Sequence, residues 1–262
     1  MCLIIFNWQP NSQRPLILAA NRDEFHMRPS LDAHFWEDNP KIFAGRDLEK
    51  KGTWLGLAKN DNSSSFRLSA LTNFRSTDNN QYKHSRGEIT QHFLETNLGA
   101  LEYAQQIPFS LYAGFNALFF DGTSLIYCHY ESHQTPDIYI LDKGIYGLSN
   151  AKLNSPWPKV EKTKIAFQSL AGNEIHEQSA KNLFHYLRDN KLAEDSLLPE
   201  TGVGIELERM LSPAFIISPS YGTRTASLVI VDVKENQQSV YFNERQFSNK
   251  GEHVRELIKR LN

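Results

Sequence analysis

The chain has 262 residues, of which 40% are hydrophobic, and a formal net charge of −2 at neutral pH. This length fits one large domain or two modest ones, and the apolar fraction suffices for a buried core. A net charge so close to zero does not indicate binding to nucleic acid. No apolar run approaches the roughly 20 residues that cross a bilayer. The N-terminus lacks the basic and apolar segments of a secretory signal, so we expect a cytoplasmic protein without an integral membrane segment.

Motifs that define a cofactor or metal site are missing. The two cysteines, Cys2 and Cys128, form no metal-binding spacing, and the sequence contains no GxSxG, HExxH, P-loop or GxGxxG pattern. We therefore expect neither a cofactor nor a metal ion. A disulfide between the two cysteines stays open, although the missing signal favours a reducing compartment. No internal repeat, proline-rich linker or long charge run divides the chain, so residues 1–262 are predicted to form a single domain.

The first two elements are predicted to be paired strands. Apolar runs from Leu3 to Phe6 and from Leu16 to Ala20 flank the turn-rich segment Gln9 to Pro15. If these strands pair antiparallel, the polar cluster from Asn21 to Glu24 lies beside Cys2. A thiol, a carboxylate and a guanidinium group then share one small volume.

The chain past this cluster is predicted to be mostly strands at first and more helical later. The segment Phe25 to Lys51 is rich in aromatics, His and Pro, and we expect an irregular pocket rim there. Further strands are predicted at Trp54–Lys59, Phe66–Phe74, Tyr112–Phe120, Leu125–Tyr130, Ile138–Leu141, Arg224–Val233 and Ser239–Asn243, with Gly144–Asn150 as a strand end entering a loop.

Apolar residues at helical spacing indicate the helices. Helices are predicted at Glu88–Asn97, Leu101–Gln106, Val160–Leu170, Ser179–Asp189, Glu206–Leu211 and Val254–Leu261. Strands at both ends of the chain, with helices between them, indicate stacked sheets covered by helices, an α+β sandwich.

Cys2 is the residue with the most distinctive chemistry. Initiator methionine is usually removed before a small side chain, and Cys2 then carries both the thiol and the α-amine of the chain. The amine has a reference pKa of about 7.7–8.0 and the thiol about 8.5, so the amine can accept the thiol proton without a histidine. If Met1 persists, the thiol lacks this internal base. The alternative is a buried small residue that only starts a strand.

Four other polar residues are candidates for the same site. Asn73 and Asn150 carry neutral amides suited to stabilising an oxyanion, although each also fits a loop or turn cap. Arg224 opens an apolar strand and is suited to anchoring a carboxylate or orienting an asparagine; its alternative is a solvated arginine on an edge strand. Asp23 is placed to position the amine of Cys2, or else forms a turn and pairs with a neighbouring arginine.

These residues lie in motifs that resemble a known family. The NRDE stretch after an MC start, followed by LTNFR, GLSNA and YGTRTAS, resembles the NRDE family, also called the transport and Golgi organisation protein 2 family. The resemblance covers essentially the whole chain. That family is similar to the N-terminal nucleophile hydrolases, whose fold is a four-layer αββα sandwich of two mainly antiparallel sheets. The branch nearest in motif order is similar to choloylglycine hydrolase and penicillin V acylase.

The resemblance implies a role for each matching residue. Cys2 matches the nucleophile and Asp23 the carboxylate near the amine. Asn73 and Asn150 match the asparagines that hold the oxyanion and the substrate-side geometry, and Arg224 matches the late arginine that supports the nucleophile.

The other members of the NRDE motif, Asn21, Arg22 and Glu24, are assigned to substrate binding. An arginine usually stands a few residues before the aspartate in those acylases. Here Ala20 occupies that region and Arg22 adjoins Asp23, which leaves the role of Arg22 open.

Two functions of different classes follow. The first is a cysteine amidohydrolase that acts on a linear amide. The second is a non-catalytic binding or trafficking protein with a pocket for a lipid-like or haem-like ligand, because the family has been linked to secretory organisation and to haem and lipid handling. The partner is thus a small-molecule amide or a lipid-like ligand, and the oligomeric state stays open. A third possibility, the glutamine-hydrolysing domain of class II amidotransferases, ranks lower because no glutamine-binding motif follows the MC start.

Overall fold

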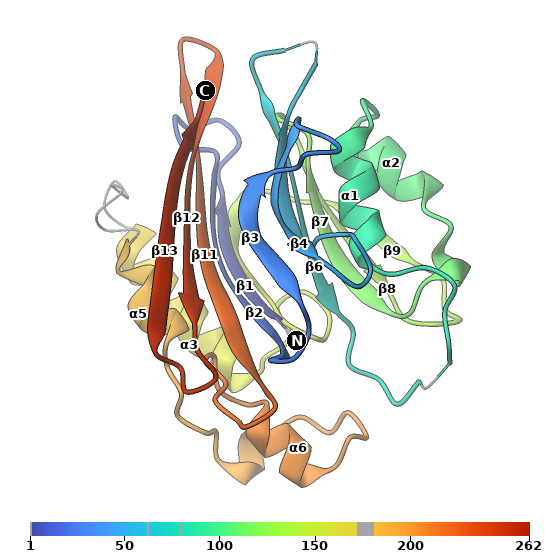
Figure 1. Cartoon of the computed structure of the whole chain (residues 1–262), viewed down its shortest axis with the longest axis vertical. Helices are drawn as coiled ribbons and strands as arrows, with labels where there is room; N and C mark the ends of the chain where they lie inside the picture. The colour runs from blue at the N-terminus through green and yellow to red at the C-terminus, as the bar shows by residue number, and fades with distance from the viewer. Residues whose placement is uncertain (1, 62, 79, 172–180) are drawn as a thin grey trace.

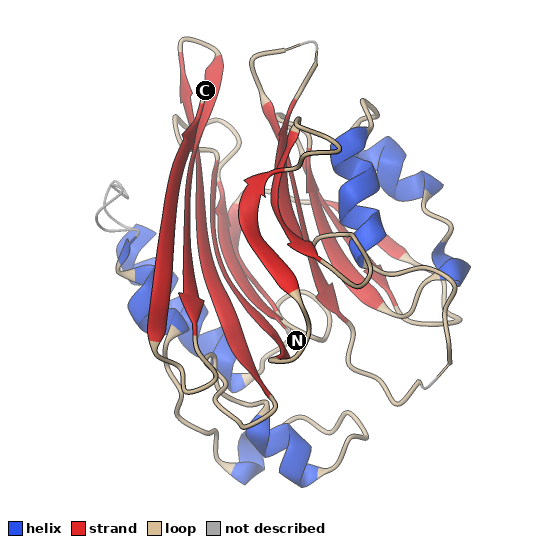
Figure 2. Ribbon diagram, in the orientation of Figure 1, coloured by secondary structure: helices blue, strands red, loops and turns tan. Residues whose placement is uncertain are grey.

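The structure is a computed structural model that describes residues 2–61, 63–78, 80–171 and 181–262. Two antiparallel sheets stack against each other, and helices cover the outer face of each sheet (Figures 1 and 2). Four layers therefore follow in the order helix, sheet, sheet, helix, which confirms the predicted α+β sandwich. No helix in the described ranges is long and apolar enough to cross a membrane.

The six-stranded sheet has the strand order β10-β1-β2-β11-β12-β13. Its strands are β1 (Cys2–Trp8), β2 (Leu16–Phe25), β10 (Gly144–Leu148), β11 (Tyr221–Lys234), β12 (Gln237–Phe247) and β13 (His253–Leu261). β1 and β2 form the predicted hairpin, and both strands extend beyond the predicted runs. Every residue of β1 is buried, because strands flank it on both sides and other layers cover both of its faces.

The strands of the seven-stranded sheet follow one another in chain order. They are β3 (Ser30–Phe35), β4 (Ile42–Asp47), β5 (Leu55–Lys59), β6 (Phe66–Asn73), β7 (Phe115–Phe120), β8 (Leu125–Tyr130) and β9 (Asp137–Ile140). β7 and β8 are joined at Asp121-Gly122, where Gly122 has a φ of 101°, a left-handed conformation that favours glycine.

Four of the helices pack on the two outer faces, and α6 (Ile205–Met210) lies at one end of the sandwich (Figure 1). The four are α1 (Gly87–Glu95), α2 (Ala100–Gln106), α3 (Pro158–Ala171) and α5 (Leu183–Leu187), and the chain also forms single 3₁₀ turns, η1 (Phe109–Leu111) and η2 (Asp195–Leu197). Side chains of α1 and α2 pack on the seven-stranded sheet, and those of α3 and α5 pack on the six-stranded sheet. Each sheet therefore meets its covering helices along an apolar interface.

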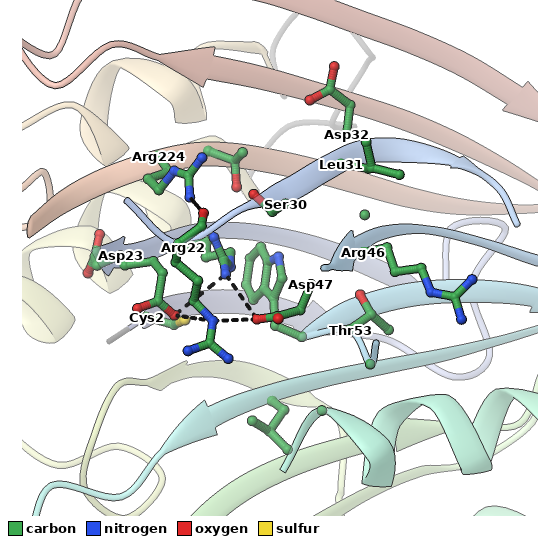
Figure 3. Close-up of a pocket in the computed structure, with 18 of the residues that line it drawn as sticks. Cys2, Arg22, Asp23, Ser30, Leu31, Asp32, Arg46, Asp47, Thr53 and Arg224 are labelled. Atoms are coloured by element: carbon green, nitrogen blue, oxygen red, sulfur yellow. Dashed lines mark hydrogen bonds and ion pairs between the residues drawn. The ribbon is translucent and has the colours of Figure 1, made fainter. Parts of the chain in front are cut away.

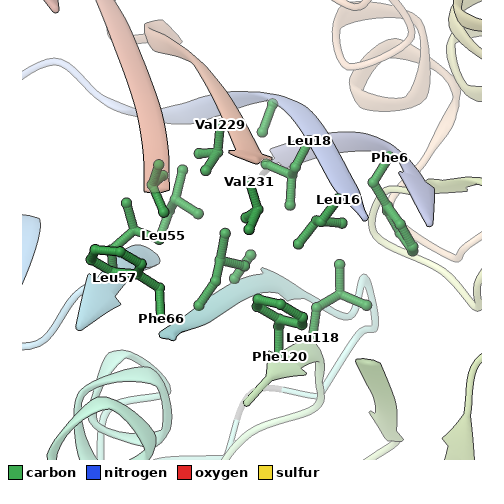
Figure 4. Packing of buried hydrophobic residues seen from close by; sticks show 14 of the residues in the cluster. Phe6, Leu16, Leu18, Leu55, Leu57, Phe66, Leu118, Phe120, Val229 and Val231 are labelled. Atoms are coloured by element: carbon green, nitrogen blue, oxygen red, sulfur yellow. The ribbon is translucent and has the colours of Figure 1, made fainter. Parts of the chain in front are cut away.

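The central core lies between the two sheets (Figure 4). Alternation along β1 sends Ile4 and Phe6 into this core, and it sends Leu3 and Ile5 toward α3 and α5. Burial of each such side chain contributes about 1.5–3 kcal/mol. The sandwich is thus held together by a central apolar layer and two outer ones.

The structure corrects two predicted elements. Val254–Leu261 was expected to be a helix because its apolar residues recur at helical spacing, but it forms β13, which pairs with the open edge of β12. Leu257 and Leu261 pack on the central core from this strand, whereas Val254 and Ile258 are exposed. The segment Phe25 to Lys51, expected to be irregular, contains the strands β3 and β4.

The predicted helix Ser179–Asp189 lies partly outside the described residues. Within them, α5 covers Leu183–Leu187, and the three residues expected on its apolar face, Leu183, Phe184 and Leu187, are buried.

Candidate functional site

A row of four side chains crosses the six-stranded sheet at one end of the sandwich. Cys2 on β1 pairs with Arg22 on β2, Arg22 pairs with Thr225 on β11, and Thr225 pairs with Gln246 on β12. Paired residues of neighbouring strands share a face of the sheet. Ile4 lies two residues beyond Cys2 and belongs to the central core, so the row faces the other sheet.

This row forms one wall of a cavity of about 390 Å³. The opposite wall comes from the seven-stranded sheet and its loops, including Asp47, Thr53 and Asn73. Cys2, Arg22 and Asp23 lie together at one end of the cavity, with Arg224 and Asp47 nearby (Figure 3). The strand pairing that the sequence predicts therefore places Cys2 beside the NRDE motif and beside a cavity.

The thiol of Cys2 is buried, with 7% of the residue exposed. Burial raises the pKa of this thiol, and the negative charge of Asp23 raises it further. The positive charge of Arg22 and a hydrogen bond from the backbone of Asp23 act in the opposite direction. A neutral thiol is thus the resting form unless a base lies beside it. The backbone carbonyl of Cys2 accepts a hydrogen bond from the Ser149 hydroxyl at 2.9 Å.

The carboxylate of Asp23 is held on one side by a hydroxyl. Thr223 donates to Oδ1 of Asp23 at 2.6 Å, and Tyr221 donates its hydroxyl to the Asp23 backbone carbonyl at 2.9 Å. Burial raises the pKa of Asp23, whereas the positive charge of Lys159 and the bond from Thr223 favour the ionised form. Asp23 is therefore fixed in orientation beside Cys2.

Lys159 on α3 is a buried cation that the sequence did not single out. Its Nζ donates to the backbone carbonyl of Leu211 at 2.9 Å. Burial lowers its pKa to about 8, and the charges of Asp23 and Cys2 oppose this shift. Nothing in the sequence around Pro158 distinguishes this lysine from Lys162, which is exposed on the same helix.

The two candidate asparagines differ in their surroundings. Asn73, at the end of β6, is half-buried and lines the cavity. Asn150 is buried, and its amide donates to the backbone carbonyl of Asn73 at 2.9 Å while its Oδ1 accepts from Ser149 at 3.2 Å. Asn150 thus joins the end of β6 to the loop after β10 and is not among the described residues that line the cavity.

The four residues of the NRDE motif lie on β2 rather than beyond it, so their side chains alternate between the two faces of the sheet. Arg22 and Glu24 face the cavity. Asn21 faces the helices, where its amide donates to the backbone carbonyls of Leu187 at 2.8 Å and Ala214 at 2.7 Å. Asn21 is not among the described residues that line the cavity. Its substrate contact stays a prediction.

Arg22 and Glu24 belong to an ion-pair cluster at the cavity. Nη2 of Arg22 lies 3.5 Å from Glu24 and 3.9 Å from Asp47. Arg28 binds Asp47 at 2.5 Å and lies 3.9 Å from Glu24. Asp47 also accepts two backbone N–H groups through its Oδ1, those of residues 49 and 50. The guanidinium beside the thiol is therefore tied to the seven-stranded sheet.

Arg224 occupies an irregularity in β11. Thr223 pairs with Asp23 and Thr225 pairs with Arg22, so Arg224 is the extra residue of a bulge. Its guanidinium donates to the backbone carbonyl of Arg28 and, at 3.5 Å, to that of Phe25. Arg224 lines the cavity with Cys2.

Two charged residues of the cavity lie outside every segment that the sequence indicated for the site. Glu244 on β12 is buried, and burial raises its pKa to about 7. It stands in the polar run Asn243–Gln246, so its neighbours in the sequence do not distinguish it from a solvated carboxylate. Arg86 lies just before α1, and its neighbours do not distinguish it either. Across the described residues, no group of three His, Cys, Asp or Glu side chains is arranged to hold a metal ion.

The layers and the site define an αββα sandwich with a cysteine at the start of an inner strand, bordering a cavity between the sheets. The family model for transport and Golgi organisation 2 matches residues 1–249. The chain therefore belongs to the transport and Golgi organisation 2 family, as its motifs predict.

Curated relatives of this family cover nearly the whole chain. The chain is 36% identical to the human transport and Golgi organization protein 2 homolog, over 95% of this chain and 94% of the relative. It is 35% identical to the mouse homolog over the same shares of the two chains. It is 28% identical to transport and Golgi organization protein 2 of Drosophila melanogaster, over 88% of each chain.

Proposed function

We propose that the protein is a cysteine amidohydrolase that cleaves a linear amide in the cavity beside Cys2. The observation that carries this proposal is that Cys2, Arg22 and Asp23, which come from two paired strands, line one end of a cavity of about 390 Å³. Buried nucleophiles with oriented charged neighbours are typical of covalent catalysis. The relatives' names supply no chemistry, so the proposal rests on this geometry and on the motif resemblance.

The reaction needs a base for the neutral thiol. In the form without Met1, the α-amine of Cys2 accepts the thiol proton, and the sulfur attacks the amide carbonyl carbon. The carbonyl oxygen becomes an oxyanion, for which the Asn73 amide and a backbone N–H are the donors. Asp23 holds the protonated amine.

The intermediate then collapses and the C–N bond breaks. The leaving nitrogen takes the proton from the α-ammonium group, and the acyl group stays on sulfur as a thioester. Water then gives a proton to the α-amine and adds as hydroxide to the thioester carbonyl carbon. The C–S bond breaks, the acid leaves, and the sulfur takes the proton from the α-ammonium group. Two protons and one water are thus accounted for without a metal or cofactor.

The test compares Cys2 with Cys128 in protein whose N-terminus has been verified by intact mass. Cys128 is buried between the seven-stranded sheet and its helices, and burial raises its pKa to about 12. We expect iodoacetamide to label Cys2 and not Cys128, and we expect a panel of acyl amides to contain a substrate. Cys128→Ala should keep the activity, and Cys2→Ala should abolish it. Labelling of Cys128 with Cys2 unmodified would refute the proposal.

The second candidate is a binding protein without catalysis, in which the same cavity holds a ligand. The raised pKa of Cys2 favours it, because a neutral thiol is a weak nucleophile. Its test is whether Cys2→Ala preserves every biological activity of the protein. The cavity favours a polar ligand over haem, because no histidine is among the described residues that line it.

A further inference from the structure

The cavity beside Cys2 contains five arginines among its described lining residues, and they differ in their partners. Arg22 and Arg28 pair with Glu24 and Asp47. Arg46 is bound by both carboxylate oxygens of Asp38, at 2.5 and 2.6 Å. These three guanidinium groups therefore have their positive charge balanced within the protein.

Arg86 and Arg224 form no such ion pair among the described residues. Nη1 of Arg86 donates to the backbone carbonyl of Gly114 at 3.1 Å, and Arg224 donates to the backbone carbonyls of Arg28 and Phe25. In the part of the chain that the structure describes, neither guanidinium lies within 4.0 Å of a carboxylate. A guanidinium group has five N–H donors in a fixed planar arrangement, so most donors of both residues remain for a ligand.

Both guanidinium groups are also partly removed from water. Burial lowers the pKa of Arg86, and the negative charge of Glu24 opposes this effect. Burial also lowers the pKa of Arg224, and the positive charge of Arg22 lowers it further, whereas the negative charges of Glu24, Asp32 and Asp47 oppose this effect. A desolvated cation with no carboxylate in direct contact is unfavourable, and an oxyanion that binds both donors would relieve this cost.

We propose that Arg86 and Arg224 form a binding subsite for an oxyanion, so that the ligand of this cavity carries a carboxylate or a phosphate-like group. Arg86 approaches from the α1 side and Arg224 from the bulge in β11, on two walls of the cavity that contains Cys2. This inference rests on the proposed function for its substrate class, which is an amide with an anionic group on its acyl or amine part. Neutral amides of the same shape bind weakly.

The test measures binding apart from turnover. Cys2→Ala protein is titrated by calorimetry with N-hexanoylglycine, with its neutral carboxamide and with the corresponding aminomethylphosphonate. Charge-assisted hydrogen bonds contribute about 1.5–3 kcal/mol, so we expect one of the two anionic probes to bind at least about tenfold more tightly than the carboxamide. The preferred anion identifies the type of oxyanion. Equal affinity for all three probes, or no binding of any, would overturn the subsite.

Matched variants in the Cys2→Ala background locate the subsite. Arg86→Gln and Arg224→Gln should each remove most of the preference for the anion. Arg46→Gln is the control, because Arg46 lines the same cavity but is bound to Asp38 and points away from Cys2 (Figure 3). The opposite pattern, with loss only in Arg46→Gln, contradicts the assignment.

A salt series on the Cys2→Ala protein tests the subsite even if a variant fails to fold. The preference for the anion should fall as ionic strength rises, whereas binding of the carboxamide should stay constant. Turnover of the same three probes by the unmodified protein then tests the proposed function separately. Selective binding without hydrolysis keeps the subsite and refutes the amidohydrolase, and hydrolysis that does not discriminate between charged and neutral probes refutes the subsite alone.

Discussion

Glu244→Gln should remove a pH dependence from the stability of the fold. The Glu244 carboxyl lies between the sheets, where Oε1 accepts the backbone N–H of Ala33 at 3.2 Å and Oε2 accepts the Ser227 hydroxyl at 3.3 Å. Burial raises its pKa to about 7 from an ordinary value of 4.5. Glutamine has the same shape and keeps both contacts, with its oxygen toward Ala33 and its amide toward Ser227, but it has no proton to lose.

The direction of the pH dependence follows from which state of the chain, folded or unfolded, holds the proton. Between the two pKa values the folded chain binds a proton that the unfolded chain has already released, so a rise in pH favours unfolding. The stabilisation is fully present below pH 4.5 and is lost as the pH rises through 7. At about 1.4 kcal/mol for each pH unit, the interval from 4.5 to about 7 corresponds to roughly 3 kcal/mol in the free energy of unfolding.

Urea unfolding across this pH interval measures the effect. Relative to Glu244→Gln, the wild-type chain should lose about 3 kcal/mol of stability between acidic and weakly alkaline pH. Glu102→Gln, at an exposed position on α2, should track the wild-type chain at every pH. If wild type and Glu244→Gln instead change in parallel, the buried carboxyl does not hold its proton as the structure implies.

Three further perturbations test other parts of the structure. Arg75 and Glu208 form a buried ion pair, with side chains 6% and 3% exposed, so Glu208→Gln should destabilise the fold by about 3–5 kcal/mol in chemical denaturation; a loss below about 1 kcal/mol would contradict the pairing. Phe120→Ala should cost about 3–5 kcal/mol by opening a void in the central core, and an unchanged unfolding midpoint would contradict that packing. Arg22→Gln should slow alkylation of Cys2 at fixed pH, because the charge of Arg22 lowers the pKa of the thiol. An unchanged or faster rate, with mass spectrometry as the readout, would show that the two groups do not interact.

Local patterns were enough to predict the sandwich and the position of Cys2. Two apolar runs separated by a turn define a hairpin, and its antiparallel register alone places Arg22 opposite Cys2. The terminal strand β13 could not be obtained in this way. Apolar residues in Val254–Leu261 recur at helical spacing, but pairing with the free edge of β12 outweighs that local preference.

The site was harder to predict than the fold. The NRDE motif was taken as one cluster after the strand, whereas β2 continues through it and sends Asn21 and Arg22 to opposite faces. Extending the alternation by four residues would have shown this. Lys159 and Arg86 could not be found, because their burial comes from segments distant in the chain and the residues themselves resemble any solvated lysine or arginine.

The row from Cys2 to Gln246 joins the first strand of the chain to one of the last. β2 finds its second neighbour, β11, only after some 200 residues have intervened, as the pairing of Asp23 with Thr223 shows. During synthesis, a partly made chain therefore displays its thiol on an incomplete sheet, with no arginine-lined cavity around it. The site therefore forms only after β11 has been synthesised, and in a shorter chain Cys2 has no cavity wall from β11 beside it.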